Sequence, residues 1–199
     1  IGGAAMLQAQ TPASPLPCEF TATVNLDGRL DDACWSKAQA TRFTAGEGHA
    51  PIERGSVQCA WDKQYLYVAA QLDDSDVVAE GKTDGLHHYL LGDNFEVFLK
   101  PDSAPCYWEF YGTPLGRQTT FFYESGGRRI ESCLQKVNRL TVRVAVEGTA
   151  NDPSDRDRGW TIEMAIPLQI FAEKGFAFGP DAHWSVLIGR YNYSKYLRQ

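Results

Sequence analysis

The chain has 199 residues, of which 43% are hydrophobic and 22% are charged, and this composition is typical of one folded globular domain. The formal net charge of −6 argues against nucleic-acid binding, because phosphates favour a basic surface, and is compatible with neutral sugars or cations. No uninterrupted apolar run is long enough to cross a bilayer, so we expect no membrane span.

The first 17 residues are predicted to form an N-terminal tail. Residues 7–9, Leu-Gln-Ala, are typical of the end of a signal peptide, although a natural linker or a cloning remnant would give a similar segment. The proline-rich segment 11–17 is typical of an extended linker. We therefore expect a secreted or periplasmic protein, bacterial in origin, with a single domain at residues 18–199.

Five cysteines occur without the C-x-x-C spacing of zinc sites. In an exported protein they are compatible with one or two disulfides, and the sequence does not determine the pairing.

Alternation with period two predicts strands over most of the domain. In residues 61–72, Leu66, Val68, Ala70 and Leu72 form an aliphatic face opposite a more polar one. Residues 93–99 repeat the pattern. The other predicted strands are residues 106–113, 117–123, 140–146, 160–166 and 184–188. These strands predict an all-β fold, an antiparallel β-sandwich of the jelly-roll or immunoglobulin-like kind.

One or two short helices are expected beside the strands. The aspartates at the start of residues 31–38 predict a capped helix with Trp35 packing inward. A second helix is predicted at residues 167–172, with proline in its first turn.

Five segments, in this order, resemble the family 9 carbohydrate-binding modules (CBM9) and their DOMON-like relatives. They are residues 26–35, 61–68, 93–99, 107–116 and 159–167. The resemblance implies a β-sandwich that binds an oligosaccharide or polysaccharide without catalysis, as part of a polysaccharide-degrading protein with a separate catalytic domain. Relatives continue with a further tryptophan loop and strand, so we expect this domain to lack its final strand.

The resemblance also implies ligand-binding residues. Glu96 matches the acidic ligand residue of the family, whereas Tyr111 and Thr113 stand where such modules have arginine and asparagine. Tyr89 and Leu90 stand near the position of a sugar-stacking tryptophan. The complete predicted ligand set is Glu96, Tyr89, His88, Tyr111, Thr113, Arg190 and Asn192.

Strand parity supports part of this set independently. Tyr107, Glu109, Tyr111 and Thr113 share one strand face, and Glu96 lies opposite the apolar face of its own strand. The alternative is an ordinary solvated sheet face with cross-strand pairs.

The loop after residue 72 is a candidate calcium site. Asp73, Asp74 and Asp76 could supply the oxygen ligands that Ca²⁺ prefers, and the resemblance also favours structural calcium. The alternative is a turn in which the aspartates bond their own backbone. His87 and His88 point to different sides of an extended chain, so they are not expected to bind one metal together.

Other function classes remain as alternatives. A haem-binding domain or a structural, protein-docking sandwich would share this fold. A glycoside hydrolase could draw two carboxylates from Glu96, Glu109 and Glu163. The sequence contains none of the nucleophile-elbow, zinc-protease or phosphate-loop motifs, so we expect no enzymatic activity.

Overall fold

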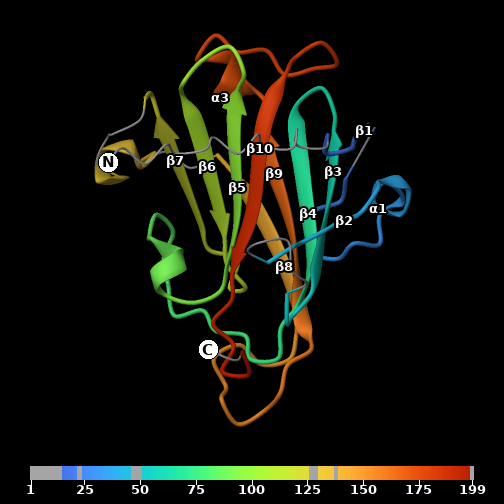
Figure 1. The fold of residues 1–199 in the computed structure, drawn as a ribbon, viewed down its shortest axis with the longest axis vertical. Coiled ribbons are helices and arrows are strands. Elements are labelled where there is room, and N and C mark those ends of the chain that lie inside the picture. Colours follow the sequence, from blue (N-terminus) through green and yellow to red (C-terminus); the bar gives the residue numbers. More distant parts are fainter. Residues whose placement is uncertain (1–14, 22–23, 46–50, 126–129, 137–138, 198–199) are drawn as a thin grey trace, which may run out of the picture.

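The computed structural model describes residues 15–21, 24–45, 51–125, 130–136 and 139–197 of the chain. Within these residues the chain forms two β-sheets with short helices at their margins (Figure 1). The predicted all-β sandwich is therefore confirmed. The proposed end of a signal peptide, at residues 7–9, lies outside the described residues.

The larger sheet has six strands, in the order β1-β3-β4-β9-β8, with β2 paired to β3. Its neighbouring strands are antiparallel except β1 and β3, which run parallel and place Cys18 opposite Cys59. The strands are β1 Cys18–Phe20, β2 Thr41–Arg42, β3 Gly55–Trp61, β4 Tyr65–Asp73, β8 Thr141–Glu147 and β9 Gly159–Pro167.

The smaller sheet has four antiparallel strands in the order β10-β5-β6-β7. They are β10 Trp184–Tyr191, β5 Asn94–Pro101, β6 Tyr107–Gly112 and β7 Gln118–Tyr123. Strands β6 and β7, predicted at residues 106–113 and 117–123, form an antiparallel hairpin. Its turn is closed by backbone hydrogen bonds from Thr113 to Arg117 and from Gly116 to Thr113, and Gly116 has a φ of 69°.

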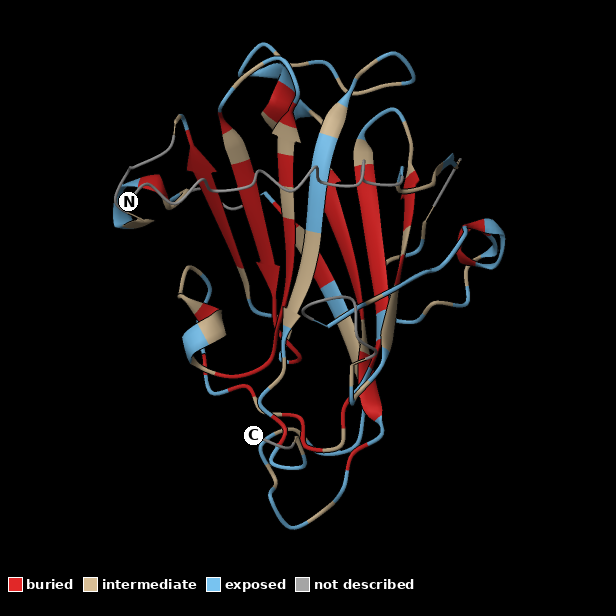
Figure 2. Cartoon of the chain, viewed as in Figure 1, coloured by how far each residue is buried: buried red, intermediate tan, exposed pale blue. Residues whose placement is uncertain are grey.

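The main core lies between the sheets, where alternate residues of each strand meet. Val68 and Ile162 point into it from the larger sheet, and Phe95 and Phe110 from the smaller sheet, each at most 1% exposed. Burying a side chain of this size stabilises the fold by about 1.5–3 kcal/mol. Met164 also packs in this core. Figure 2 shows β4 to β7 as mainly buried and β10 as mainly exposed or intermediate.

The segment predicted as one strand at residues 61–72 is instead a turn followed by β4. Asp62 Oδ1 accepts hydrogen bonds from the backbone amides of Gln64 and Tyr65, so the chain reverses between Trp61, the end of β3, and Tyr65. The face of β4 that the sequence suggested was more polar is also partly covered, because Tyr67 packs beside the first helix. Residues 94–99 of the second predicted strand are in β5 and belong to the other sheet, and Asp93 precedes that strand.

Helix α1, Ala33–Lys37, packs on the outer face of the larger sheet and buries Trp35. The indole Nε1 of Trp35 donates a 2.8 Å hydrogen bond to Glu163 in β9. The predicted aspartate cap is wrong: the N-cap residue Asp32 makes no side-chain bond to the helix, and its carboxylate accepts the amide of Asn25 instead.

The other helices are equally short. They are the 3-10 helix η2 His88–Leu90, α2 Ile130–Cys133 and α3 Gln169–Ala172. The predicted helix at residues 167–172 is thus present as α3, but Pro167 still belongs to β9. All five cysteines are free thiols.

Candidate functional site

The outer face of the smaller sheet brings two carboxylates and several aromatic rings together. The antiparallel register of β5 and β6 pairs Glu96 with Tyr111 and Phe98 with Glu109. The two carboxylates are therefore diagonal neighbours on one sheet face, close enough to repel each other electrostatically. We call this face, defined by Asn94, Glu96, Glu109 and Tyr111, the outer cluster.

Both carboxylates are held by neighbouring side chains. The Asn94 amide donates a 2.7 Å hydrogen bond to Glu96, and the Tyr111 hydroxyl donates a 2.5 Å hydrogen bond to Glu109. Glu96 is only 5% exposed and Glu109 only 7%. Burial raises the pKa of Glu96 to about 7, the bond from Asn94 opposes this shift, and the nearby Glu109 adds to it. Burial also raises the pKa of Glu109.

Aromatic rings border the outer cluster on one side. Tyr89, in η2, lies 6.2 Å from the ring of Tyr111 and 5.5 Å from that of Tyr191 in β10, measured between ring centroids. The hydroxyl of Tyr193 donates to the backbone carbonyl of Tyr89, which fixes the position of η2 against the end of β10. Tyr191 remains 45% exposed, so part of this aromatic border faces solvent.

An open space adjoins Glu96 on its other side. Gly189 in β10 is the direct cross-strand partner of Glu96, and a Cβ atom added to it would have no neighbour within 4 Å. A glycine inside a strand often marks a place where a ligand or another backbone approaches closely. Glu96 thus has a tyrosine on one flank and free space on the other.

The predicted ligand residues His88 and Thr113 lie outside the outer cluster and serve other contacts. His88 is 1% exposed, burial lowers its pKa to about 4, and neither ring nitrogen has a hydrogen-bond partner. Its ring fits there because Gly81 has no side chain: a Cβ on Gly81 would lie 2.7 Å from His88 Nδ1. Thr113 serves the β6–β7 turn, where its hydroxyl accepts the amide of Arg117.

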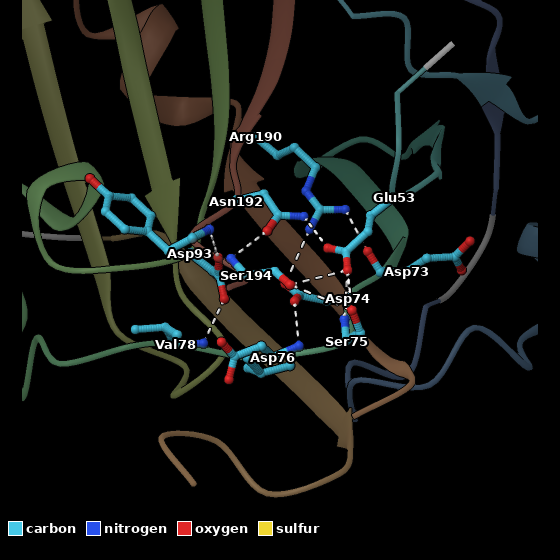
Figure 3. Close-up of polar contacts among 12 residues, drawn as sticks. Glu53, Asp73, Asp74, Ser75, Asp76, Val78, Asp93, Arg190, Asn192 and Ser194 are labelled. Carbon is cyan, nitrogen blue, oxygen red and sulfur yellow. Dashed lines mark hydrogen bonds and ion pairs between the residues drawn. The ribbon is translucent and has the colours of Figure 1, made fainter. Parts of the chain in front are cut away.

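Arg190 and Asn192 belong to a second group of polar side chains at one end of the sandwich (Figure 3). Arg190 Nη2 contacts Asp74 Oδ2 at 3.1 Å, and its Nη1 donates to the backbone carbonyl of Asp73 at 2.9 Å. The Asn192 amide donates to Glu53 at 2.5 Å. We call this group the end cluster. It fastens the segment after β10 to the loops that follow β2 and β4.

The end cluster holds more carboxyl groups than basic groups: Asp74 and Asp93 lie near the single guanidinium group of Arg190. Burial, together with repulsion from Asp93, raises the pKa of Asp74 to about 8, although Arg190 opposes the shift. Burial raises the pKa of Asp93 to about 6. Asp93 accepts the backbone amides of Val78 and Tyr193, both at 2.7 Å, so it links the start of β5 to the chain after β10. These contacts make the end cluster a structural junction.

The three aspartates proposed for calcium do not point to one place. Asp73 turns its carboxylate away from the others, as Figure 3 shows, while Asp74 contacts Arg190. Asp76 accepts the amide of Lys195 and lies 3.6 Å from its Nζ atom. Among the described residues, no group of three or more histidine, cysteine, aspartate and glutamate side chains is arranged to hold a metal ion. Calcium at this loop stays a prediction, which the melting temperature with calcium and with a chelator can test.

Sequence reasoning missed Asn94 in the outer cluster and two residues beside the cluster, Gly189 and Tyr191. Asn94 was visible as the residue two positions before Glu96, hence on the same strand face. Tyr191 and Gly189 carried no signal alone, because their place depends on the β10–β5 register, which pairs them with Asn94 and Glu96. Glu53 in the end cluster lies outside every predicted strand and gave no signal.

Comparison with known proteins identifies the family. The model of the family described as carbohydrate family 9 binding domain-like matches residues 26–179. The chain belongs to this family. The match spans the strands from β2 to β9 and therefore includes Glu96, Glu109 and Tyr111 of the outer cluster.

Solved structures related to this CBM9-like domain share little sequence with it. A protein from Bacteroides uniformis ATCC 8492, assigned as carbohydrate-binding, is 14% identical, with a TM-score of 0.61 over 92% of this chain and 84% of its own. A family 9 module from Caldicellulosiruptor kristjanssonii in complex with cellotriose is 16% identical, with a TM-score of 0.49 over 76% of this chain and 66% of its own. A family 9 module from the same organism in complex with glucose is 17% identical, with a TM-score of 0.48 over 76% and 68%.

No curated protein matches the sequence of this CBM9-like domain. The first of the solved structures confirms the shared fold. In the described part of the chain, helices are all too short or too polar to cross a membrane.

Proposed function

We propose that this CBM9-like domain binds carbohydrate, without catalysis, at the outer face of the smaller sheet. The observation that supports the location is the outer cluster itself: two hydrogen-bonded carboxylates lie beside tyrosine rings and next to the open space at Gly189. Sugar sites combine flat apolar surfaces with a few placed hydrogen-bonding groups. Family membership supports the ligand class.

The exposed tyrosines provide a surface for a sugar ring. Tyr89 and Tyr191 form the border, and Tyr191 can present its ring to the C–H face of a sugar. Glu96, which lies directly opposite the open space at Gly189, can then accept a hydrogen bond from a sugar hydroxyl. The end cluster would contribute only indirectly, by holding the segment that carries Tyr193 and thereby supporting Tyr89.

The expected export of the protein and its attachment to a polysaccharide-degrading enzyme extend this proposal. They are supported by the sequence of the first 17 residues and by the family resemblance. A glycoside hydrolase using Glu163 is disfavoured, because its carboxylate, in β9 of the larger sheet, is buried against Trp35.

The test is isothermal titration of the domain with a panel of soluble oligosaccharides, including cellotriose. The variant Gly189→Val fills the space beside Glu96, and we expect it to lower affinity at least tenfold without lowering the melting temperature. Gly179→Val is the matched control, since a Cβ at Gly179 also meets nothing within 4 Å. Binding of no saccharide, or equal binding by both glycine variants and the wild type, would overturn the proposed site.

A further inference from the structure

We propose that the outer cluster is built for a sugar that carries a free amine, with the ammonium group held by Glu96 and Glu109. This inference rests on the proposed carbohydrate function and specifies its ligand class. It follows from which hydrogen-bonding groups in the cluster are already used, from the charge that the cluster leaves unbalanced, and from the space beside it.

The donors of the outer cluster are already committed to its own carboxylates. The Asn94 amide bonds Glu96, and the Tyr111 hydroxyl bonds Glu109. The Asn94 carbonyl oxygen, Oδ1, is fully buried and has no hydrogen-bond partner in the part of the chain that the structure describes. A buried carbonyl left without a donor costs about 1–3 kcal/mol. The carboxylate oxygens of Glu96 and Glu109 keep further acceptor capacity, which suits a ligand that offers several donors at one point.

Among the residues that the structure describes, no lysine or arginine forms an ion pair with Glu96 or Glu109. The ion pairs among the described residues join Arg139 to Glu173, Arg158 to Glu147, Arg190 to Asp74 and Lys195 to Asp76. None of them includes Glu96 or Glu109. His87 lies on the same face, stacked 5.5 Å from the ring of Phe121, and favours the ionised form of Glu109.

Buried carboxylates are costly unless they are paired or hydrogen-bonded. A neutral sugar hydroxyl supplies a hydrogen bond but no charge, so it does not favour the ionised form of either carboxyl group. An ammonium group supplies three donors and a positive charge together. Charge-assisted hydrogen bonds of this kind are roughly twice as strong as neutral ones.

The surroundings favour an amino sugar over a free cation. The space at Gly189 lies directly across from Glu96 and can admit a ring substituent. Tyr191 and Tyr89 border it with ring faces that suit both sugar C–H groups and a nearby positive charge. A basic peptide side chain could bind the carboxylates, but it has no ring to stack on the tyrosines.

The experiment compares three trisaccharides on the wild-type domain by isothermal titration at pH 7 and physiological ionic strength. They are a glucosamine trimer, its fully N-acetylated counterpart and cellotriose. We expect the glucosamine trimer to bind at least tenfold more tightly than either neutral trimer. N-acetylation removes the charge of the amine, so this comparison needs no variant and does not depend on the folding of one.

Variants then locate the effect. Glu96→Gln and Glu109→Gln should each reduce the preference for the amine to less than threefold, while Glu147→Gln, an exposed carboxylate, should leave it unchanged. Equal affinity for all three trimers would overturn the amine preference while the carbohydrate function stands. Binding of no trimer would overturn the amine preference, and the carbohydrate function would then be decided by the wider oligosaccharide panel. A preference lost equally in Glu147→Gln, or tighter binding of trilysine than of the glucosamine trimer, would show attraction by charge alone and overturn the inference.

Discussion

The Trp35 indole donates its hydrogen bond to Glu163 across 128 residues of sequence. The same carboxylate accepts the backbone amides of Asp27 and Gly28, at 3.0 and 2.8 Å. One fully buried side chain thus satisfies three donors from the segment that enters and forms α1. This arrangement fastens the N-terminal part of the domain to the outer face of the larger sheet.

We expect Glu163→Ala to lower the free energy of unfolding by at least ~3 kcal/mol, because it leaves three donors without their acceptor. Trp35→Phe removes only one of the three donors, so we expect it to lower the free energy of unfolding less than Glu163→Ala does. Urea unfolding of both variants measures the effect, with the exposed Glu147→Ala as control. An unchanged denaturation midpoint for Glu163→Ala would contradict the role assigned to this carboxylate.

The Arg190–Asp74 pair gives a second prediction about stability. Arg190 donates to the Asp74 carboxyl group and to the Asp73 carbonyl, and a buried acceptor left without its donor costs about 1–3 kcal/mol. We expect a loss of this size for Arg190→Met and a smaller loss for the double variant Arg190→Met/Asp74→Asn. Thermal and urea denaturation test this, and Arg158→Met, which removes an exposed pair, should change stability by less than about 0.5 kcal/mol. A cost at Arg158 as large as that at Arg190 would refute the argument.

Glu96 should make the stability of the domain depend on pH. Its pKa is about 7 in the folded state, above the usual value of 4.5, so the folded state binds more protons between these values. The contribution of Glu96 to the free energy of unfolding is therefore largest below about pH 4.5 and is lost as the pH rises to about 7. The change is on the order of 1–2 kcal/mol after allowance for solvent screening.

The variant Glu96→Gln isolates that contribution from those of Asp74 and Asp93, whose raised pKa values act in the same direction. The free energy of unfolding, measured for wild type and variant at pH 5 and pH 8, should fall more steeply in the wild type. Equal pH dependence in the two proteins would show that Glu96 titrates normally.

Two glycines in the smaller sheet should respond oppositely to the same substitution. A Cβ on Gly112 would lie 2.5 Å from Ile162 Cδ1 and 2.7 Å from Met164 Cε, inside the core. Gly112→Ala should therefore destabilise the domain by about 1–3 kcal/mol. Gly189→Ala has room and should be neutral or stabilising, since glycine weakens a strand. Melting temperatures of the two variants decide this, and a stable Gly112→Ala would contradict the packing described.

The strands could be predicted from the sequence because apolar and polar residues alternate along them, and this alternation indicates that one face of each strand packs in the core. The prediction from alternation was wrong at residues 61–72, where Asp62 forms a turn between β3 and β4. The residues on either side of this turn are hydrophobic enough to read as one continuous strand. The covered second face of β4 was also not predictable, because it depends on the distant packing of α1.

Site prediction was limited by long-range register. Glu96 and Tyr111 were identified from a resemblance and from parity, and the structure places them side by side. Arg190 and Asn192 were grouped with them, but the inward face of β10 directs Arg190 toward Asp74. A single strand pattern gives the two faces of a strand, but it does not say which partners lie opposite each face.

Strand β10 joins the outer cluster and the end cluster through consecutive residues. Gly189 and Tyr191 face the first, and Arg190 between them reaches the second. Inserting or deleting one residue within this strand would move every side chain to the opposite face. It would then expose the arginine, bury the tyrosine and disable both clusters at once. A substitution at an exposed position of β10, such as Leu187, keeps this register, whereas a change in the length of the strand does not.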